Sequence, residues 1–115
     1  MATPSNPPHP EKSEWLIHVP DFLDAKYRRT AVFPQHMARM KSDPEDFWVF
    51  GGATLKDCVT PGQPPHITGS AMLVYAPSRD YVLARLKDDP LVKERIWDLE
   101  NATIHPFFRP KRGPV

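Results

Sequence analysis

Two short segments of the chain carry residue types suited to acid–base chemistry. His36 follows Pro34, and Asp89 lies directly before Pro90. Proline is common at the first position of helices, so each segment is expected to open a helix. A histidine in such a first turn lies at the positive end of the helix dipole, which favours a neutral ring that can accept a proton near pH 7. A carboxylate beside that ring would fix one tautomer and stabilise the ring once it is protonated.

A His36–Asp89 pair of this kind could take a proton from carbon or oxygen and return it elsewhere, with no cofactor. Elimination, dehydration and isomerisation are the reactions that it suits. The alternative is structural: His36 is then a partly exposed helix residue, and Asp89 only caps the helix that begins at Pro90. Asp88 is a second candidate for the carboxylate. The catalytic hypothesis therefore requires that one of these carboxylates reaches His36.

Composition narrows the class of protein. A chain of 115 residues is expected to form one domain with a modest core, and a pair of copies would enclose a pocket better than one copy. The net charge of +1 disfavours nucleic acid as a partner. The single cysteine, Cys58, excludes an internal disulfide and favours a reducing compartment. No apolar run approaches the roughly 20 residues of a membrane span. We therefore expect a cytoplasmic protein whose partners are a small-molecule substrate and further copies of itself, a homodimer or a higher homo-oligomer.

The 15 prolines indicate where the chain changes character. Residues 1–12 are rich in proline and have no hydrophobic periodicity, so a disordered or loosely docked arm is expected there. Residues 13–108 are expected to form the folded domain, and residues 109–115 a basic tail. The other prolines lie where one periodic pattern gives way to another, as expected for residues that end or begin an element.

Hydrophobic patterns within the domain predict four strands and four helical segments. The strands are expected over residues 15–19, 47–50, 67–75 and 101–108, and the helices over 21–29, 34–41, 79–86 and 90–97. The order of strands and helices is typical of a ferredoxin-like βαββαβ sandwich, an α+β fold with an antiparallel sheet and helices on one face. The other face, expected to carry Trp15, Trp48 and Met72, must be covered, and two such sheets face to face would form a barrel.

Several short motifs occur in a characteristic order along residues 14–108. They are Arg28-Arg29 upstream of Pro34-x-His36-x-x-Arg39, Gly51-Gly52 after the second strand, Thr68-Gly69-Ser70, Asp89-Pro90-Leu91 and His105-Pro106-Phe107. Their order and spacing resemble the YCII-related family of dimeric α+β barrel proteins. The resemblance implies a ferredoxin-like dimer with an active site at the His–Asp pair, and a dehydrochlorinase-like activity is among the few understood in the family. Phe33 departs from the family pattern, because many members have an arginine there, and it replaces a polar contact with an apolar wall.

Further residues are candidates for binding a substrate. Arg28 and Arg29 could orient a carboxylate or phenolate, or could belong to a solvated helix face. Trp48 and Trp97 could line an aromatic pocket for a planar substrate, or could pack in the core. Ser70 could donate a hydrogen bond into the cavity, or could be an ordinary strand residue.

Glycines and histidines complete the set of candidates. Gly51 and Gly52 could let a ligand approach the backbone, or could accommodate a bulge or turn. His18 and His105 are expected on neighbouring strands, but two histidines without a third ligand make a poor metal site. We therefore expect neither a metal nor a cofactor.

The sequence as a whole favours a cofactor-independent lyase or isomerase that acts on a small ring-containing metabolite, such as an intermediate of polyketide or other secondary-metabolite biosynthesis. His36 would be the general base and acid, and Asp89 would orient it. One alternative is a non-catalytic ligand-binding or regulatory module whose proline-rich arm recruits a partner. Another is an oxygenase-type barrel that uses haem or molecular oxygen.

Overall fold

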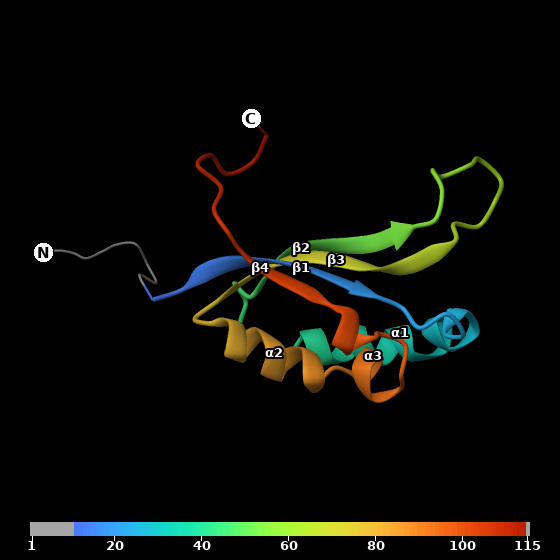
Figure 1. Ribbon diagram of the computed structural model, residues 1–115, viewed down its shortest axis with the longest axis horizontal. Coiled ribbons are helices and arrows are strands. Elements are labelled where there is room, and N and C mark those ends of the chain that lie inside the picture. The colour runs from blue at the N-terminus through green and yellow to red at the C-terminus, as the bar shows by residue number, and fades with distance from the viewer. Residues whose placement is uncertain (1–10, 115) are drawn as a thin grey trace, which may run out of the picture.

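The computed structural model describes residues 11–114, which form an antiparallel sheet with helices on one face (Figure 1). Most of the predicted arm, residues 1–10, lies outside the described residues. The strands are β1 (Ser13–Pro20), β2 (Trp48–Leu55), β3 (Ile67–Ala76) and β4 (Thr103–Phe107). The helices are α1 (Lys26–Met40), α2 (Arg79–Lys87) and α3 (Pro90–Lys93), with a short 3₁₀ turn η1 (Leu99–Asn101) before β4. The sheet order is β2-β3-β1-β4 and each neighbouring pair is antiparallel, which confirms the ferredoxin-like α+β fold.

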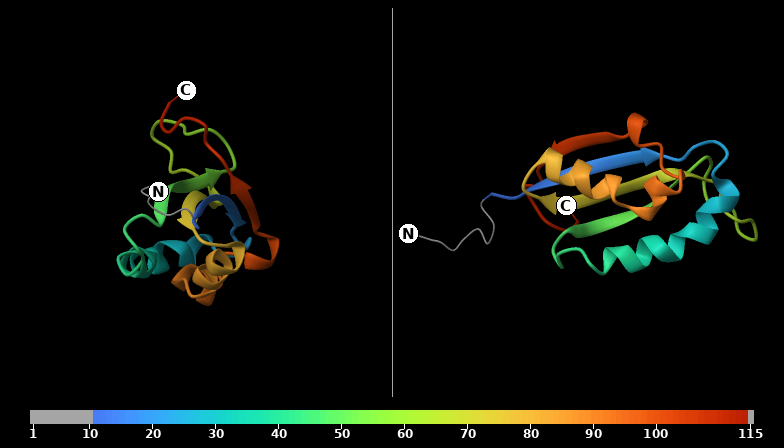
Figure 2. Two further views of the ribbon diagram at one scale, coloured as in Figure 1. Left: turned by 90° about the vertical axis from the view of Figure 1, so that its left-hand side faces the viewer. Right: turned by 90° about the horizontal axis from the view of Figure 1, so that it is seen from below.

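The core lies between the sheet and its helices, and Figure 2 shows that α1, α2 and α3 all cover the same face. Alternate residues of each strand point to this side, as the two-residue period of a strand requires. Ile17 of β1, for example, pairs with Met72 of β3 and Ile104 of β4, and all three lie on the helix side. The buried core residues are Ile17, Val19, Ala25, Val32, Phe47, Met72, Val74, Ala76, Val82, Leu86, Leu91, Ile96 and Trp97. Among residues 11–114, no helix has the length and apolar character that crossing a membrane requires.

The prediction that Pro34 opens a separate helix is wrong. Helix α1 runs without a break from Lys26 to Met40, and Pro34 lies inside it. Proline removes one backbone hydrogen bond from a helix interior, but burial of Arg29, Val32 and His36 on one face keeps the turns before and after it in place. His36 therefore lies in the second half of α1, away from the positive end of the helix dipole.

Three further boundaries differ from the sequence prediction. The helix expected from residue 21 begins only at Lys26, since Asp21 forms a backbone bridge with Trp97. Strand β2 continues through Gly51 and Gly52, because their backbones pair with Met72 and Ala71 of β3 whatever their side chains. The helix expected over residues 90–97 ends at Lys93, since the chain turns sharply at Arg95, whose φ is 60°. The residues beyond that turn enter the core and do not continue a helix.

The expected assignment of large residues to the open face of the sheet is also wrong. Trp15 and Met72 occupy the alternate positions that face the helices, and Trp48 lies against His36 of α1. A pattern of alternation shows which residues share a face, but not which face is covered. The open face instead carries the second set of alternating residues of each strand, including Phe50 and Phe107.

The described part of the basic tail runs back over this open face. Arg109 donates hydrogen bonds to both carboxylate oxygens of Glu14 in β1, the Nε bonds measuring 2.9 and 3.2 Å. In Figure 1 the tail and the 56–66 loop both project from the side of the sheet opposite the helices.

Candidate active site

His36 and Asp89 meet between α1 and the start of α3. The Nδ1 atom of His36 lies 2.9 and 2.8 Å from the two carboxylate oxygens of Asp89. Asp89 is completely buried, and His36 is 7% exposed. Asp89 is also the N-cap of α3, where its Oδ1 accepts a 2.9 Å hydrogen bond from the Leu91 amide. The same carboxylate thus caps the helix and contacts the histidine, so capping does not keep Asp89 away from His36.

Asp88, the other candidate carboxylate, points elsewhere. It is an exposed residue that forms ion pairs with Arg39 at 3.0 Å and with Lys93 at 3.1 Å. The structure therefore brings Asp89, and not Asp88, to His36.

An arginine and a second aspartate support the pair from behind. Arg85 Nη1 donates to Asp89 Oδ2 at 2.9 Å, while its Nε and Nη2 donate to Asp43 at 2.7 and 2.9 Å. Asp43 also accepts a 2.8 Å hydrogen bond from the indole of Trp48. Sequence reasoning missed both residues. The four-residue spacing of Arg85 and Asp89 is a signal for the first, since such residues are neighbours on a helix, whereas Asp43 lies in a loop with no comparable signal.

The pair and its support favour an ionised Asp89. Burial alone would raise the pKa of Asp89, but hydrogen bonds from His36, the Leu91 amide and Arg85 hold that pKa below its ordinary value. The pKa of Asp43 also lies below its ordinary value. Burial alone would raise it, but hydrogen bonds from Arg85 and Trp48 outweigh that effect. An ionised carboxylate only accepts hydrogen bonds, so the proton between the two groups belongs on Nδ1 of His36. Nε2 is then the nitrogen that can accept a proton.

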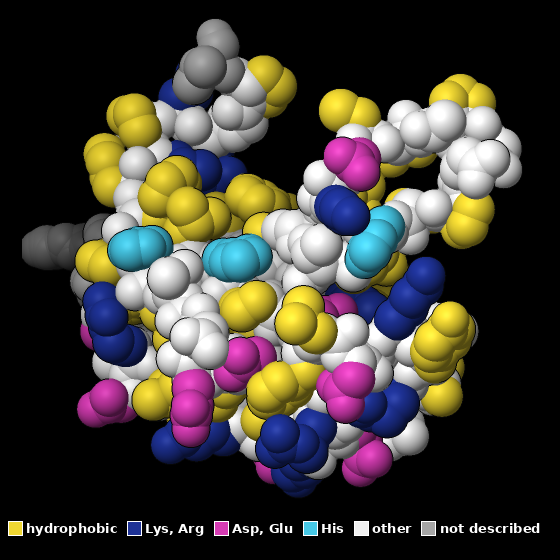
Figure 3. All heavy atoms as spheres, turned by 45° about the vertical axis from the view of Figure 1, so that its right-hand side comes forward, with side chains coloured by type: hydrophobic (Ala, Val, Ile, Leu, Met, Phe, Trp, Pro, Cys, Tyr) yellow, Lys and Arg dark blue, Asp and Glu magenta, His cyan; other side chains and the backbone are white. Residues whose placement is uncertain are grey.

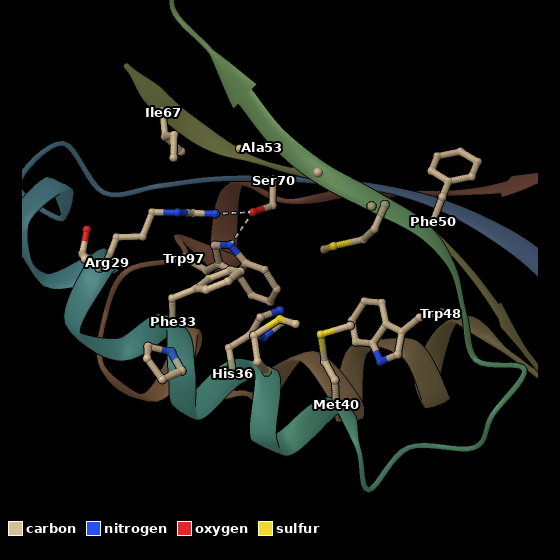
Figure 4. Close-up of a pocket in the computed structure, with 16 residues that line it drawn as sticks. Arg29, Phe33, His36, Met40, Trp48, Phe50, Ala53, Ile67, Ser70 and Trp97 are labelled. Atoms are coloured by element: carbon tan, nitrogen blue, oxygen red, sulfur yellow. Dashed lines mark hydrogen bonds between the residues drawn. The ribbon is translucent and has the colours of Figure 1, made fainter. Parts of the chain in front are cut away.

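A cavity of about 660 Å³ opens beside His36, between α1 and the strands β2 and β3 (Figure 4). Its wall is mostly apolar and aromatic, and its ionisable members are Arg29 and His36. The lining residues are Arg29, Thr30, Phe33, Pro34, His36, Met37, Met40, Trp48, Phe50, Gly51, Gly52, Ala53, Ile67, Ser70, Met72 and Trp97. An apolar hollow with a few convergent polar groups is the usual form of a small-molecule site.

Most of the residues singled out from the sequence line this cavity. Besides His36, they are Arg29, Trp48, Gly51, Gly52, Ser70 and Trp97. Asp89 lies behind His36 and does not line the cavity itself. Arg28 is not brought to the cavity, because its guanidinium donates to the backbone oxygens of Asp24 and Arg95.

Ser70 lies at the centre of a second polar group in the cavity. Arg29 Nη2 donates to Ser70 Oγ at 2.8 Å, and Trp97 Nε1 donates to the same atom at 3.1 Å (Figure 4). The other end of the Arg29 guanidinium is held by Asp21, whose two oxygens lie 2.6 and 2.7 Å from Nη1. Asp21 was not anticipated from the sequence, since only the fold brings the end of β1 beside α1.

His18 and His105 lie on the side of the sheet away from the helices. His18 and His105 are on neighbouring strands, but they do not face each other directly, since His105 pairs with Leu16 and His18 with Thr103. Within residues 11–114, no group of three or more His, Cys, Asp or Glu side chains is placed to hold a metal ion.

The chain has relatives among biosynthesis cluster proteins. The Xenovulene A biosynthesis cluster protein asL2 of Sarocladium schorii is 31% identical over 113 residues, with 94% of each chain covered. The chain belongs to the family of this protein. Another relative, the Aspercryptin biosynthesis cluster protein B of Emericella nidulans, is 36% identical over 96 residues. That match covers 82% of the present chain and 62% of its relative, so the chain spans less than two thirds of the relative's length.

The fold of the chain is also that of a solved enzyme. The 5-chloro-2-hydroxyhydroquinone dehydrochlorinase of Burkholderia phenoliruptrix, solved in complex with 2,5-dihydroxybenzoquinone, matches with a TM-score of 0.73 at 21% identity. The match covers 88% of the chain and 99% of the dehydrochlorinase, and the TM-score shows that the two share a fold. No protein-family model matches the chain, so membership of the YCII-related family stays a prediction.

Proposed function

We propose that the protein is a cofactor-independent lyase or isomerase that acts on a small ring-containing metabolite, in polyketide or other secondary-metabolite biosynthesis. His36 is the general base and acid, and Asp89 is its orienting partner. The observation that carries the proposal is the 2.8 Å contact between His36 Nδ1 and a buried carboxylate, at the wall of a largely apolar cavity.

The geometry suits a proton transfer in two stages. Nε2 of His36 removes a proton from substrate carbon, and the electron pair of the broken C–H bond moves into the substrate. The resulting imidazolium is stabilised by the negative charge of Asp89, which Arg85 helps to keep ionised. In an isomerisation the imidazolium returns the proton to another carbon. In an elimination the new pair forms a C=C bond as the leaving group departs, and the imidazolium supplies a proton to that group.

The comparisons support the class of substrate. Two relatives carry the names of biosynthesis clusters, for Aspercryptin and Xenovulene A. The enzyme that shares the fold is a dehydrochlorinase, and it was solved with a hydroxylated quinone. A planar oxygenated ring is also what the aromatic wall of Trp48 and Trp97 favours, because flat rings stack or pack edge to face on indoles.

We also infer that two copies pair through the open face of the sheet. Phe50 and Phe107 are 54% and 39% exposed there. Figure 3 shows hydrophobic side chains gathered on the surface between the projecting tail and the 56–66 loop. Exposed apolar side chains on a sheet face favour association, and a second sheet is the flat surface that fits them.

The proposal is tested by turnover without added cofactor. The first probe is 5-chloro-2-hydroxyhydroquinone, followed by cyclic β-hydroxyketones, with mass spectrometry to detect loss of HCl, loss of water or deuterium uptake from D₂O. We expect conversion by the wild-type protein and a loss of about 100-fold or more in His36→Ala. An unchanged far-UV circular dichroism spectrum must show that the variant is folded. Undiminished turnover in His36→Ala rejects the role of His36, and binding without conversion of any probe favours a ligand-binding module instead.

A further inference from the structure

Both acceptor positions of the Ser70 hydroxyl are already occupied. Its Oγ accepts one hydrogen bond from Arg29 Nη2 and one from Trp97 Nε1. Guanidinium and indole N–H groups only donate, and a serine hydroxyl has two acceptor positions and one proton. The two bonds therefore use the acceptor positions and leave the proton free to donate. Within residues 11–114, no side-chain or backbone oxygen accepts that proton.

The free donor belongs to the cavity. Ser70 is 6% exposed and is one of the residues that line the cavity wall. Buried polar groups are normally paired, so a buried hydroxyl without an acceptor indicates that something else supplies one. A ligand oxygen in the cavity is in position to do so.

The groups behind Ser70 make it a strong and fixed donor. The positive charge of Arg29 withdraws electron density from the hydroxyl oxygen, which strengthens the O–H as a donor. Arg29 is held by Asp21, and the two side chains are only 10% and 7% exposed. Trp97 is anchored by a backbone bridge to the same Asp21. Because these contacts exist before a ligand binds, little reorganisation is needed when charge develops on a ligand oxygen.

The position of Ser70 relative to His36 would let one substrate ring contact both residues. Trp97 lies between them in Figure 4. Its ring centroid is 5.3 Å from that of His36, and its Nε1 donates a hydrogen bond to Ser70 Oγ. A planar ring over Trp97 can therefore present an oxygen to Ser70 and a carbon to His36.

We propose that Ser70 is an oxyanion-binding catalytic residue, and that the substrate carries a ketone or phenolic oxygen near the carbon from which His36 removes a proton. This inference rests on the proposed function for the role of His36. When the C–H bond breaks, its electron pair forms a C=C bond to the carbonyl carbon. The π pair of the C=O bond then moves to oxygen, and the Ser70 hydroxyl stabilises the enolate or phenolate that results. When that enolate collapses, its electron pair follows one of two routes. It forms a bond to the proton that His36 returns to a carbon, or it forms a C=C bond as a leaving group departs.

Binding of a phenolate tests the donor without any need for turnover. The probes are 4-nitrophenol, at a pH where it is ionised, and 4-nitroanisole, which has the same ring but no charge. We expect the wild-type protein to prefer the phenolate, and Ser70→Ala to weaken phenolate binding by about 10- to 100-fold, the range for a hydrogen bond to a charged group. Binding of 4-nitroanisole should change by less than about twofold, because its ether oxygen is a weak acceptor.

Two further variants keep the test decisive. Ser70→Cys preserves the size of the side chain with a weak S–H donor, so it should also lose the preference for the phenolate. Thr54→Val removes a hydroxyl of the neighbouring strand that bonds to Thr68 outside the cavity, and should keep that preference. An unfolding temperature close to that of wild type must accompany each result.

The outcomes separate this inference from the proposed function. No phenolate preference in the wild type, no phenolate binding, or an equal preference in Ser70→Ala overturns the role of Ser70, whatever His36→Ala does to turnover. A preference that depends on Ser70, in a protein whose His36→Ala variant still turns over substrate, supports the oxyanion site and rejects His36 as the base.

Discussion

Arg85 and Asp89 are four residues apart, and Arg85 Nη1 donates a 2.9 Å hydrogen bond to the same carboxylate oxygen that lies 2.8 Å from His36 Nδ1. Asp89 thus contacts both Arg85, which is always positively charged, and His36, which becomes positively charged when it accepts a proton. Through Asp43, the same arginine also holds the indole of Trp48 at the cavity wall. One buried network therefore orients both the proposed base and part of the surface against which a substrate would lie.

The role of Asp89 is tested by comparison with its neighbour. Asp89→Asn keeps the size of the side chain and an oxygen for the Leu91 amide, but removes the charge that stabilises a protonated His36. We expect turnover to fall by about 100-fold or more, measured on the same substrate as for His36→Ala.

Asp88→Asn is the matched control, because it makes the same change one residue away. Its carboxylate contacts Arg39 and Lys93 at the surface, where ion pairs contribute little. Turnover and unfolding temperature should both stay close to those of wild type. Equal losses in the two variants would contradict a specific role for Asp89.

Acid should weaken the buried network through Asp43. Its folded-state pKa lies below the ordinary value, because Arg85 and Trp48 outweigh the effect of burial. The folded protein then binds fewer protons at Asp43 than the unfolded chain does. The stabilisation is complete above the unfolded pKa of about 3.9 and is lost as pH falls through the lower folded pKa.

Urea unfolding at a series of pH values measures this effect. The gap in the free energy of unfolding between wild type and Asp43→Asn should narrow as pH falls from neutrality to about 3. Asp24→Asn changes a side chain that is 81% exposed, so its free energy of unfolding should vary with pH as that of wild type does. A gap for Asp43→Asn that stays constant across this range would show that its charge does not stabilise the fold.

The fold could be predicted from the sequence because its signals are local. Alternating and helical patterns each involve neighbouring residues, and their order alone indicates a ferredoxin-like sandwich. The pairing of His36 with Asp89 was also anticipated, from the motifs that carry them. What failed was the reason given for it: Pro34 does not open a helix, and His36 owes its environment to Asp89 and not to a helix terminus.

The rest of the site depends on contacts between distant parts of the chain. Asp21 reaches Arg29, and Asp43 reaches Arg85, only after β1 and α1 have packed against the other elements. Arg28 and Arg29 are adjacent and identical in type, and the sequence cannot distinguish them. Helical geometry turns one to the backbone of Arg95 and the other to Ser70.

Gly69, next to Ser70, is required by a close approach of two strands. A Cβ at this position would lie 2.5 Å from the Val19 carbonyl oxygen and 2.9 Å from the Cα of Pro20, and neither backbone atom can move away alone. Gly69→Ala should therefore lower the free energy of unfolding by about 1–3 kcal/mol, the usual cost of overpacking. Gly52→Ala is the control, since a Cβ there meets no atom within 4 Å. Equal unfolding temperatures for the two variants would contradict this account.

Pairing of two copies through the open face of the sheet is tested at Phe107. Its pairing with Glu14 places it on the face away from the helices, where it is 39% exposed. A charge introduced by Phe107→Asp would be buried without a partner between two sheets, so the variant should sediment largely as a monomer where wild type is a dimer. Leu23→Asp makes a similar change at a fully exposed residue of the β1–α1 connection, and should leave the dimer intact. Sedimentation velocity distinguishes these cases, and a wild-type protein that stays monomeric at high concentration would rule out the pairing.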